Sequence, residues 1–554
     1  MLQHQDSMRK GMALLLICAA FMGYAAAVCP AAVHTAQAET AAFVPDPGLQ
    51  AYTPDAQTAA LLLSELRGGF NYFWDTANTH PGSKGYGLIP DRMPSNPQVS
   101  SIAAVGYGLA ACCIGAERGF VAREDAEARA LGTMRTLRDH AAGQNGFFYH
   151  FLDMQTGARC WNCELSVIDT CICINGALAA GAYFGGACEA LARELYERVE
   201  WPWYQNPDTG WYYMGYRPES GFFGAWDMTA EQLMMYFLGA GSPTHPIDGS
   251  AFYRFARPVA RYGSGPAFIH SPIGSLFVYQ FSHLWFDLRG YRDANGADWY
   301  TNSVSAALAN RLYAIDSADL YGTGPEDWGF SACDGPRGYS GDYGAPPSQH
   351  YRNDGTIATH AAAASLPFIP SYAAAAVSAQ YRVPGLAGDY GLKDAYNKAN
   401  NGLWIAGDTL GLNKGASLIM IENYLTGFIW KLMDGVRAVQ LGMENCGLCY
   451  TEPPVSLHHV ILSGGRRSGD TLDVLWDTYP YANILVRSVQ WYRSASPSGA
   501  DAAPIAGANA LSYTLQPEDT DSFVLCELTG LLDGTDGYTE LPPVRSHVSV
   551  RIVR

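Results

Sequence analysis

The chain has little positive charge for its length. Of its 554 residues, 35 are Lys or Arg and 52 are Asp or Glu, so the formal net charge is −17. Neither a basic stripe nor a polybasic tail stands out, and few cations are present to neutralise the phosphates of a nucleic acid. The composition therefore argues against a nucleic-acid partner.

Signatures of cofactor binding are also missing. No glycine-rich, phosphate-cradling loop follows a predicted strand, so nothing indicates a nucleotide or a flavin. Two Cys-x-x-Cys pairs, Cys160/Cys163 and Cys446/Cys449, lie too far apart in the chain for a zinc ribbon and have no obvious further ligands. We therefore predict no metal and no cofactor.

Long hydrophobic runs are scarce, and the clearest one lies at the N-terminus. Met8-Arg9-Lys10 supplies a positive region, residues 11–28 are mostly apolar and small, and Ala36-Gln37-Ala38 is an A-x-A cleavage pattern. No stop-transfer pattern follows, and no later segment is expected to be apolar enough to span a bilayer. We predict a signal peptide over residues 1–38, cleaved near Ala38, and a secreted, periplasmic or cell-surface protein without a membrane span.

The chain has 13 cysteines, two of which, Cys18 and Cys29, lie in the predicted signal peptide. In an oxidising compartment, disulfide bonds are the favoured use of the two Cys-x-x-Cys pairs. Four more cysteines lie in apolar helical segments and are expected to be buried thiols: Cys112, Cys171, Cys173 and Cys188.

Aromatic side chains are abundant. The chain has 34 Tyr, 22 Phe and 13 Trp, against 35 Lys and Arg together. Aromatic faces serve as platforms for sugar rings, and carboxylates accept hydrogen bonds from sugar hydroxyls. Many large secreted domains share this composition, but it also fits a carbohydrate-binding protein, and an oligo- or polysaccharide is the predicted partner.

The chain divides into a helical part and a strand-rich part. Residues 39–54 contain three prolines and are interpreted as a linker. Helical periodicity then recurs between long Gly-, Pro- and aromatic-rich loops, without a fixed-period repeat. Helices are expected at residues 101–119, 124–142, 168–184, 188–199, 229–238, 275–288, 299–312, 356–364, 371–380 and 421–436. We predict a mainly α fold, an (α/α)6 toroid over residues 55–450, with its active site where the loops gather.

Strand-like alternation is scarce before about residue 450 and frequent after it. Segments such as “LDVLWD”, “ILVRSVQWYRS” and “SFVLCELT” alternate and are separated by turns that contain Asn, Gly and Asp. We predict a C-terminal β-sandwich over residues 456–554 that resembles bacterial Ig-like modules. Its expected role is that of a spacer or an accessory binder.

Several stretches of the helical part are similar to one bacterial family. They include “FNYFWDTANTHPGSKGYGLIPDR”, “EQLMMYFLGAGSPTHPI”, “WGFSACDGPRGY”, “NDGTIATHAAAASLPFIP” and “LGLNKGASLIMIENYLTGFIWKLM”. Together they resemble the bacterial glucoamylase-like domain, which includes endo-β-1,2-glucanases and a module of cyclic β-1,2-glucan synthases. The resemblance implies an (α/α)6 toroid that acts on β-glucosides without a catalytic metal.

Glycoside cleavage needs an acid that protonates the leaving oxygen and a second carboxylate that attacks or activates water. The resemblance places the acid at Glu231, which precedes the “GSPTHP” turn. A Glu in a first helical turn can also simply complement the helix dipole, with Thr229 as the N-cap. Asp227 is expected to be a helix cap or a substrate contact.

The second carboxylate is expected in “CELSVIDT”. Ser166 and Asp169 have the spacing of a capping box, which explains Asp169 without any chemistry. The resemblance instead makes this helix start an edge of the active site, where endo-β-1,2-glucanases carry two acids in a “DxxE” pattern. Ser166 replaces the first of these acids here and Asp169 the second, and Glu164 is a candidate substitute from the preceding loop. The second catalytic group is therefore Asp169 or Glu164.

Further polar and aromatic residues in loop-rich stretches are candidate substrate contacts. They are Asp91, Arg92, Asp227, Trp328, Asp334 and Asp354. Two of the aspartates precede glycine and fit equally well as turns. Weaker candidates for the pocket wall are Glu422 and Lys414, and two histidines expected to hold loops rather than act as bases are His245 and His360.

The predicted function is that of an exported glycoside hydrolase that cleaves β-glucan, with β-1,2-linked glucan favoured, by carboxylate acid/base catalysis. One alternative is an exo-acting glycosidase or a transglycosylase of the same family on another glycoside. Another is a non-catalytic glycan-binding surface protein, which the acid missing at Ser166 favours. The sequence does not fix the stereochemistry or the oligomeric state.

Overall fold

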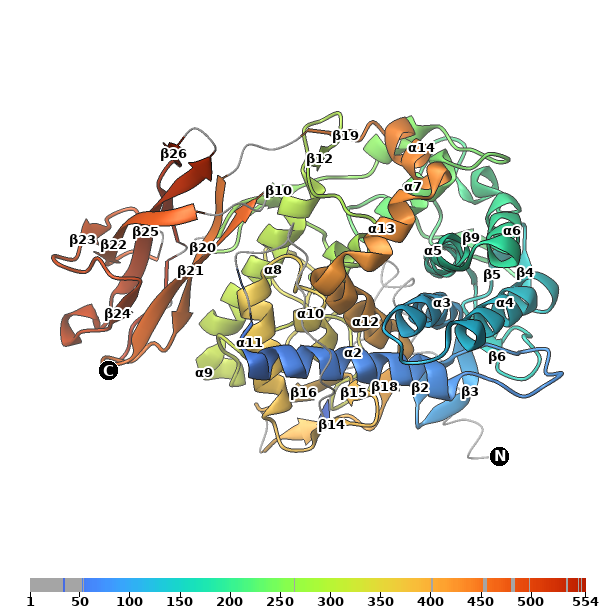
Figure 1. Ribbon diagram of the computed structural model, residues 1–554, viewed down its shortest axis with the longest axis horizontal. Helices are drawn as coiled ribbons and strands as arrows, with labels where there is room; N and C mark the ends of the chain where they lie inside the picture. The colour runs from blue at the N-terminus through green and yellow to red at the C-terminus, as the bar shows by residue number, and fades with distance from the viewer. Residues whose placement is uncertain are drawn as a thin grey trace.

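The protein has a mainly helical part followed by a C-terminal β-rich part, as predicted (Figure 1). The computed structural model describes residues 33–34, 52, 54–263, 265–399, 402–451, 456–479, 484–497, 499–534, 537–546, 548–549 and 551–554. The predicted signal peptide (residues 1–38) and linker (residues 39–54) lie almost entirely outside the described residues.

The helices form an inner and an outer layer. Buried on nearly all sides are α3 (Ile102–Glu117), α5 (Val167–Phe184) and α12 (Gly411–Thr426). Packed outside them, each with an exposed face, are α2 (Ala56–Thr76), α4 (Arg123–Asp139) and α6 (Gly186–Glu197). The remaining α-helices among the described residues are α7 (Leu233–Ala240), α8 (Trp299–Asp316), α9 (Ala318–Tyr321), α10 (Thr359–Ala363), α11 (Pro370–Tyr381), α13 (Phe428–Asp434) and α14 (Arg437–Asn445). Because α3 packs against both α5 and α12, these three helices share one core.

Two glycines bring α3 and α5 into close contact and so fix the start of α5. A Cβ atom at Gly176 would lie 2.0 Å from the backbone oxygen of Gly106, and one at Gly106 would lie 2.5 Å from that of Ile172. No side chain fits between the two backbones, so glycine is required at both positions. This contact sets the position of the first turn of α5, which carries Asp169.

Short strands lead into the buried helices. One antiparallel sheet has the order β18-β2-β3-β6, with β18 (Thr409–Leu410), β2 (Pro90–Met93), β3 (Asn96–Ser101) and β6 (Phe151–Asp153). A second has the order β7-β8-β9, with β7 (Leu165–Ser166), β8 (Gly215–Arg217) and β9 (Gly221–Phe223). Strand β3 runs into α3, β7 into α5 and β18 into α12. With two to six residues each, these strands are too short to show alternation in the sequence.

The helical part contains further short strands. They are β1 (Val33–His34), β4 (Gly143–Gln144), β5 (Phe147–Phe148), β10 (Val259–Ala260), β11 (Phe268–Ile269), β12 (Tyr291–Arg292), β13 (Thr356–Ala358), β14 (Leu386–Gly388), β15 (Gly391–Leu392), β16 (Ala395–Asn397), β17 (Trp404–Ile405) and β19 (Cys449–Tyr450). Strand β13 occupies the start of the helix predicted at 356–364, so that helix is shorter than expected.

Two other predicted helices differ from the structure. The segment 275–288 forms two short 3-10 helices rather than one α-helix, and the Phe277 amide there donates to Ser331 Oγ at 3.0 Å instead of to its own helix. The segment 421–436 is interrupted at Gly427, which takes a left-handed conformation with φ 65° and separates α12 from α13.

The C-terminal part has two sheets and a core of its own. One sheet contains β20 (Ser456–Gly464), β21 (Thr471–Tyr479) and β24 (Ser512–Thr514). The other contains β22 (Ile484–Ser494), β23 (Ala503–Pro504), β25 (Phe523–Gly534), β26 (Gly537–Glu540) and β27 (Val544–Arg545). Trp491 of β22 is fully buried, 5.5 Å from the ring of Tyr513. Tyr372 of α11 donates to the backbone oxygen of Leu462 of β20 at 2.9 Å and so links the two parts.

All cysteines within the described ranges are free thiols, so the disulfides predicted for the two Cys-x-x-Cys pairs are not formed. The Cys163 thiol instead contacts the backbone amide of Phe151 at 3.3 Å, and the Cys446 thiol donates to the Tyr236 oxygen at 3.6 Å. Cys449, by contrast, is exposed. The four thiols predicted to be buried in helices are buried: Cys112, Cys171, Cys173 and Cys188.

Helix α5 corrects the expectation that no segment beyond the signal peptide is apolar enough to cross a bilayer. It is the one helix among the described residues that has the length and composition of a membrane span. However, 83% of this span is buried inside the protein. The apolar run therefore belongs to a core helix that packs against α3 and α6.

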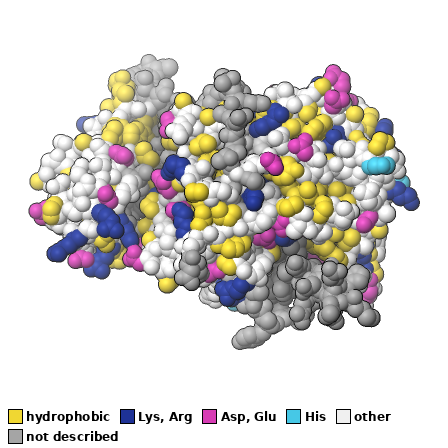
Figure 2. Space-filling model, turned by 90° about the horizontal axis from the view of Figure 1, so that it is seen from below, with side chains coloured by type: hydrophobic (Ala, Val, Ile, Leu, Met, Phe, Trp, Pro, Cys, Tyr) yellow, Lys and Arg dark blue, Asp and Glu magenta, His cyan; other side chains and the backbone are white. Residues whose placement is uncertain are grey.

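Positive charge is dispersed on the face of the molecule shown in Figure 2. Its Lys and Arg side chains lie in small separate groups, several of them next to Asp or Glu. Pairs such as Arg138–Asp139 at 2.7 Å and Arg437–Glu444 at 3.0 Å neutralise surface arginines locally. The described residues of this face form no continuous basic stripe for a polyanion.

Two buried histidines predict a loss of stability in acid. Burial lowers the pKa of His283 to about 4 and that of His360 to about 3. The unfolded chain binds these protons near pH 6.5 and the folded protein does not, so the free energy of unfolding falls as the pH drops from about 6.5 towards 4. Thermal denaturation at pH 7 and pH 4.5 measures this, and His360→Gln is expected to narrow the gap between the two Tm values. The partly exposed His245→Gln serves as the control, and equal gaps in wild type and His360→Gln would refute the expectation.

Candidate active site

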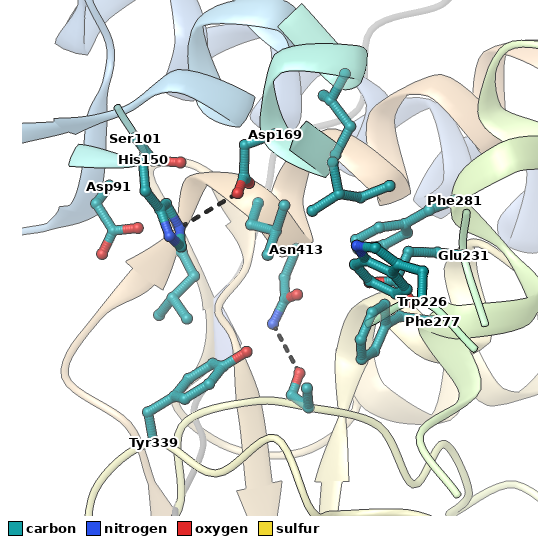
Figure 3. Close-up of a pocket in the computed structure, with 15 residues that line it drawn as sticks. Asp91, Ser101, His150, Asp169, Trp226, Glu231, Phe277, Phe281, Tyr339 and Asn413 are labelled. Carbon is teal, nitrogen blue, oxygen red and sulfur yellow. Dashed lines mark hydrogen bonds and ion pairs between the residues drawn. The ribbon is translucent and has the colours of Figure 1, made fainter. Parts of the chain in front are cut away.

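A cleft lies where the buried helices begin (Figure 3). It encloses about 710 Å³, part of which is open to solvent. Its lining residues are Asp91, Ser101, His150, Ile168, Asp169, Ile172, Trp226, Glu231, Phe277, Phe281, Ala332, Tyr339, Leu410, Leu412 and Asn413. Ser101 immediately precedes α3, and Asp169 and Asn413 lie in the first turns of α5 and α12. Figure 3 shows Asp169 and His150 on one side of the cleft and Glu231, Trp226, Phe277 and Phe281 on the other.

Glu231 lines the cleft with a carboxyl group that is suited to act as an acid. The residue is 4% exposed, and its Oε2 has no hydrogen-bond partner among the described residues. Burial, and then the charge of Asp169, raise the pKa of Glu231 to about 8, so the group is protonated at neutral pH. The Ser282 hydroxyl donates to the Glu231 backbone oxygen at 2.7 Å and holds this turn just before α7.

The turn that carries Glu231 is not capped as the sequence suggests. Helix α7 begins at Leu233 with Gln232 in the N-cap position, so the expected cap at Thr229 is wrong. The Thr229 hydroxyl donates to the Ala256 backbone oxygen at 2.7 Å instead. Glu231 therefore lies outside the helix, and complementing a helix dipole does not account for its burial.

Asp169 lies in the first turn of α5 and is 6% exposed. Ser166 is the N-cap, as predicted, and its hydroxyl accepts from the Asp169 amide at 3.2 Å. The Asp169 carboxylate accepts from the same hydroxyl through Oδ2, and His150 Nε2 lies 3.6 Å from that oxygen. No residue in the described ranges hydrogen-bonds to Oδ1. The helix cap and the cleft therefore use the same aspartate, with one carboxylate oxygen left for a ligand.

Glu164, the other candidate for the second catalytic carboxylate, is not among the residues that line the cleft. Its Oε1 lies 2.9 Å from His150 Nδ1, and its Oε2 accepts from Arg217 at 3.5 Å. Burial by itself would raise the pKa of Glu164, but the hydrogen bond from His150 and the charges of His150 and Arg217 outweigh it and lower that pKa. Glu164 is thus ionised at neutral pH and lies behind His150.

A second charged cluster borders the cleft beside β2. Asp91 lines the cleft, and Arg92 contacts Asp91 at 3.1 Å, Asp334 at 2.9 Å and Asp408 at 3.7 Å. Burial raises the pKa of Asp334 despite its contact with Arg92. Of the three predicted contacts in this cluster, Asp91 lines the cleft. Arg92 and Asp334 are not among the lining residues and pair with each other behind Asp91.

The other predicted contacts lie away from the cleft lining. Asp227 does not line it, although the neighbouring Trp226 does. Trp328 is fully buried in the core. Asp354 closes a turn, in which its Oδ1 accepts from the Thr356 hydroxyl at 2.6 Å, so the interpretation as a turn is correct there.

The weaker candidates are structural. Glu422 pairs with Arg118 at 2.8 Å, and Lys414 pairs with Glu65 at 2.5 Å, in buried ion pairs outside the cleft. His360 contacts Ser331 Oγ at 3.2 Å, and His245 contacts the Thr244 hydroxyl at 3.1 Å, which fits the loop-holding role predicted for them.

Several cleft residues carry no signal that the sequence analysis used. The most prominent are His150, Trp226, Phe277, Tyr339 and Asn413. His150 interrupts the aromatic stretch “FFYHFLD”, and a titratable residue between apolar neighbours is a usable hint of a buried site. The aromatic residues of the cleft are indistinguishable in sequence from those of the core, because both classes are buried.

Comparison with known proteins places the chain in a family. A family model named Glycoamylase, described as “Putative glucoamylase”, matches residues 224–437, which include Glu231. A solved structure of a “putative glucoamylase” from Bacteroides uniformis is 30% identical, covers 72% of this chain and 99% of its own, and superposes with a TM-score of 0.64. The chain belongs to this family of glycoside hydrolases. The resemblance of the helical part to the glucoamylase-like family is confirmed.

Two further relatives have named activities. An endo-β-1,2-glucanase from Chitinophaga pinensis, solved with sophorotriose and glucose, is 28% identical over 71% of this chain and 98% of its own, with a TM-score of 0.63. An exo β-1,2-glucooligosaccharide sophorohydrolase (non-reducing end) from Parabacteroides distasonis is 27% identical over 68% of this chain. This chain spans 56% of the length of that curated relative.

Proposed function

We propose that this glycoside hydrolase cleaves β-1,2-linked glucan or its oligosaccharides. The observation that carries the proposal is the pair of carboxyl groups across one cleft: Glu231, which is protonated at neutral pH, faces Asp169, which is held by Ser166 and His150. Glycosidases need one carboxyl group in each protonation state. The two relatives named for β-1,2-glucan support the substrate class.

In the proposed reaction, the Glu231 carboxyl donates its proton to the glycosidic oxygen as the bond to the anomeric carbon breaks. Asp169 stabilises the developing positive charge at that carbon. It then either attacks the carbon itself or removes a proton from the attacking water. Trp226, Phe277 and Tyr339 supply aromatic surface against which sugar rings can pack.

The arrangement of the chain is proposed on the same basis. The inner and outer helical layers support an (α/α)6 toroid, with the cleft at the end where the buried helices begin. The two C-terminal sheets and the buried Trp491 support an Ig-like module that acts as a spacer or an accessory glycan binder. The N-terminal segment supports export to the periplasm or the cell surface.

Exo action is the second candidate, favoured by the P. distasonis relative, whose name specifies the non-reducing end. A non-catalytic binder is disfavoured. Its best support was the acid missing at position 166, but the Ser166 hydroxyl holds Asp169 in place and so has a role in a functional site.

The test is product analysis on a panel of β-1,2-, β-1,3-, β-1,4- and α-1,4-glucans with wild type and Glu231→Gln. We expect wild type to cleave the β-1,2 chain alone and the variant to be inactive. Release of one uniform short product from the start of the reaction identifies exo action, and a spread of lengths identifies endo action. Wild-type inactivity on all four polymers and on β-1,2-linked glucooligosaccharides would refute the proposal.

A further inference from the structure

His150 lies between two carboxylates on the cleft wall. The residue is 8% exposed and immediately precedes β6. Its Nδ1 lies 2.9 Å from Glu164 Oε1, and its Nε2 lies 3.6 Å from Asp169 Oδ2. The ring is stacked on Phe151, with centroids 3.9 Å apart and planes 14° apart. Both edges and one face of the imidazole are therefore fixed.

The backbone around this ring is fixed as well. The His150 backbone amide donates to the backbone oxygen of Glu164 at 3.0 Å. The His150 backbone oxygen accepts from the amide of Ile102, the first residue of α3, at 3.0 Å. The ring thus bridges Glu164, which immediately precedes β7, and Asp169 in the first turn of α5. It needs no rearrangement to keep its contacts with both carboxylates.

We propose that His150, as an imidazolium, is a positioning residue that links Glu164 to Asp169 and holds the Asp169 carboxylate oriented opposite Glu231. This inference rests on the proposed function, because it assigns the support of one of the two catalytic carboxylates. His150 itself transfers no proton to or from the glycan in this scheme. Glu164, His150 and Asp169 thus form a row of alternating charges. Glu164, at the end of the row away from the cleft, is also paired with Arg217.

The two contacts require the charged form of the ring. A neutral imidazole has one N–H, so one of its nitrogens would present a lone pair to a carboxylate oxygen. The imidazolium has two N–H groups and opposite charge to both neighbours. Burial opposes this charge, but Asp169 and the hydrogen bond to Glu164 outweigh burial and raise the pKa of His150 to about 9.

The charge acts on Asp169 and not on Glu231. His150 Nε2 lies 3.6 Å from Asp169 Oδ2, and no contact joins His150 to Glu231 among the described residues. The titratable and charged groups that interact with His150, Asp169 or Glu164 include Asp91, Tyr107, Cys171, Cys173, Arg217 and Glu231. Arg217 contacts Glu164, whereas His150 is the cation that contacts Asp169 in the described structure.

The test is the pH dependence of kcat and kcat/KM for wild type, His150→Gln and Glu164→Gln on the substrate identified above. We expect His150→Gln to lower kcat by about 10- to 100-fold and to leave KM within about threefold. The acidic limb of its profile should move up, because the carboxylate side of the cleft loses its adjacent cation. The alkaline limb should stay in place, since Glu231 is untouched. Glu164→Gln should move the acidic limb in the same direction by less.

Chemical rescue separates this role from a merely structural one. His150→Ala opens space at the cleft wall, and free imidazole should restore part of kcat at pH 6, where it is mostly protonated, and little at pH 9. Asp169→Asn should not respond to imidazole at either pH. If His150→Ala does not fold, the shifted acidic limb of Glu164→Gln carries the test.

Three results would overturn the inference: kcat of His150→Gln within twofold of wild type, a rise in KM alone, or an acidic limb that does not move. Failure of the proposed function looks different. In that case wild type itself is inactive, or Glu231→Gln remains active, whatever the His150 variants do.

Discussion

Replacement of Glu231 by Gln is expected to abolish turnover and to stabilise the protein. Loss of a general acid costs about 10²- to 10⁴-fold in kcat. The wild-type alkaline limb of the pH–rate profile should lie near pH 8, where Glu231 loses its proton. Steady-state kinetics on β-1,2-glucan between pH 4 and pH 10 measure both effects.

The stabilisation follows from the same shift. Burial raises the pKa of Glu231 from 4.5 to about 8, so the folded protein holds a proton that the unfolded chain releases above pH 4.5. The free energy of unfolding of wild type therefore falls as the pH rises through this window, by about 1.4 kcal/mol for each unit of pKa shift. Glu231→Gln has no charge to bury, so its Tm advantage over wild type should grow from pH 5 to pH 9.

Asp227→Asn is the matched control for Glu231→Gln. It removes a carboxylate four residues away that does not line the cleft, and its kcat should stay within about twofold of wild type. A Tm difference between Glu231→Gln and wild type that is the same at pH 5 and pH 9 would show that Glu231 ionises normally. Such a result would remove it as the acid.

Asp169→Asn is expected to lower kcat by at least about 10³-fold, because the amide can neither attack the anomeric carbon nor take a proton from water. The amide keeps the size of the side chain, so folding and glycan binding should persist. Binding is measured by titration calorimetry of the Asp169→Asn variant with an oligosaccharide, which this variant leaves uncleaved during the measurement. Retention of more than a tenth of wild-type kcat would contradict the assignment.

The role of Asp169 is decided by the first product of wild type. Proton NMR of the reducing end, recorded before mutarotation, gives the anomeric configuration. Retention means that Asp169 is the nucleophile, and azide should then rescue Asp169→Ala with formation of a glycosyl azide. Inversion means that Asp169 activates water. Glu164→Gln should be active in either case, which distinguishes the support residue from the catalytic one.

The sequence determined the broad organisation because that depends on local patterns. Apolar periodicity located most helices, such as α3 and α5, within a few residues. Alternation after residue 450 located the C-terminal strands. The family motif also singled out Glu231, since the residues around it are contiguous in the chain. The capping pattern that begins at Ser166 correctly predicted the start of α5.

Only the tertiary structure decided which carboxylates share a cleft. Glu164 and Asp169 are five residues apart, yet one lies behind His150 and the other lines the cleft. Asp227 and Trp328 have the local texture of a binding site, but one lies away from the cleft lining and the other is buried in the core. The sequence is silent on these distinctions because they arise from contacts between distant segments.

The protonation states of Glu231 and His150 likewise depend on the tertiary structure. Glu231 is protonated at neutral pH because burial and the charge of Asp169 raise its pKa. The two residues are 62 positions apart in the chain, so only the fold brings them together. His150 is held between two anions because β6 and β7 place it there. Residue type and local pattern fix helices and strands, whereas charge, burial and orientation are fixed by long-range packing. The chemistry of this protein therefore becomes visible only in the folded chain.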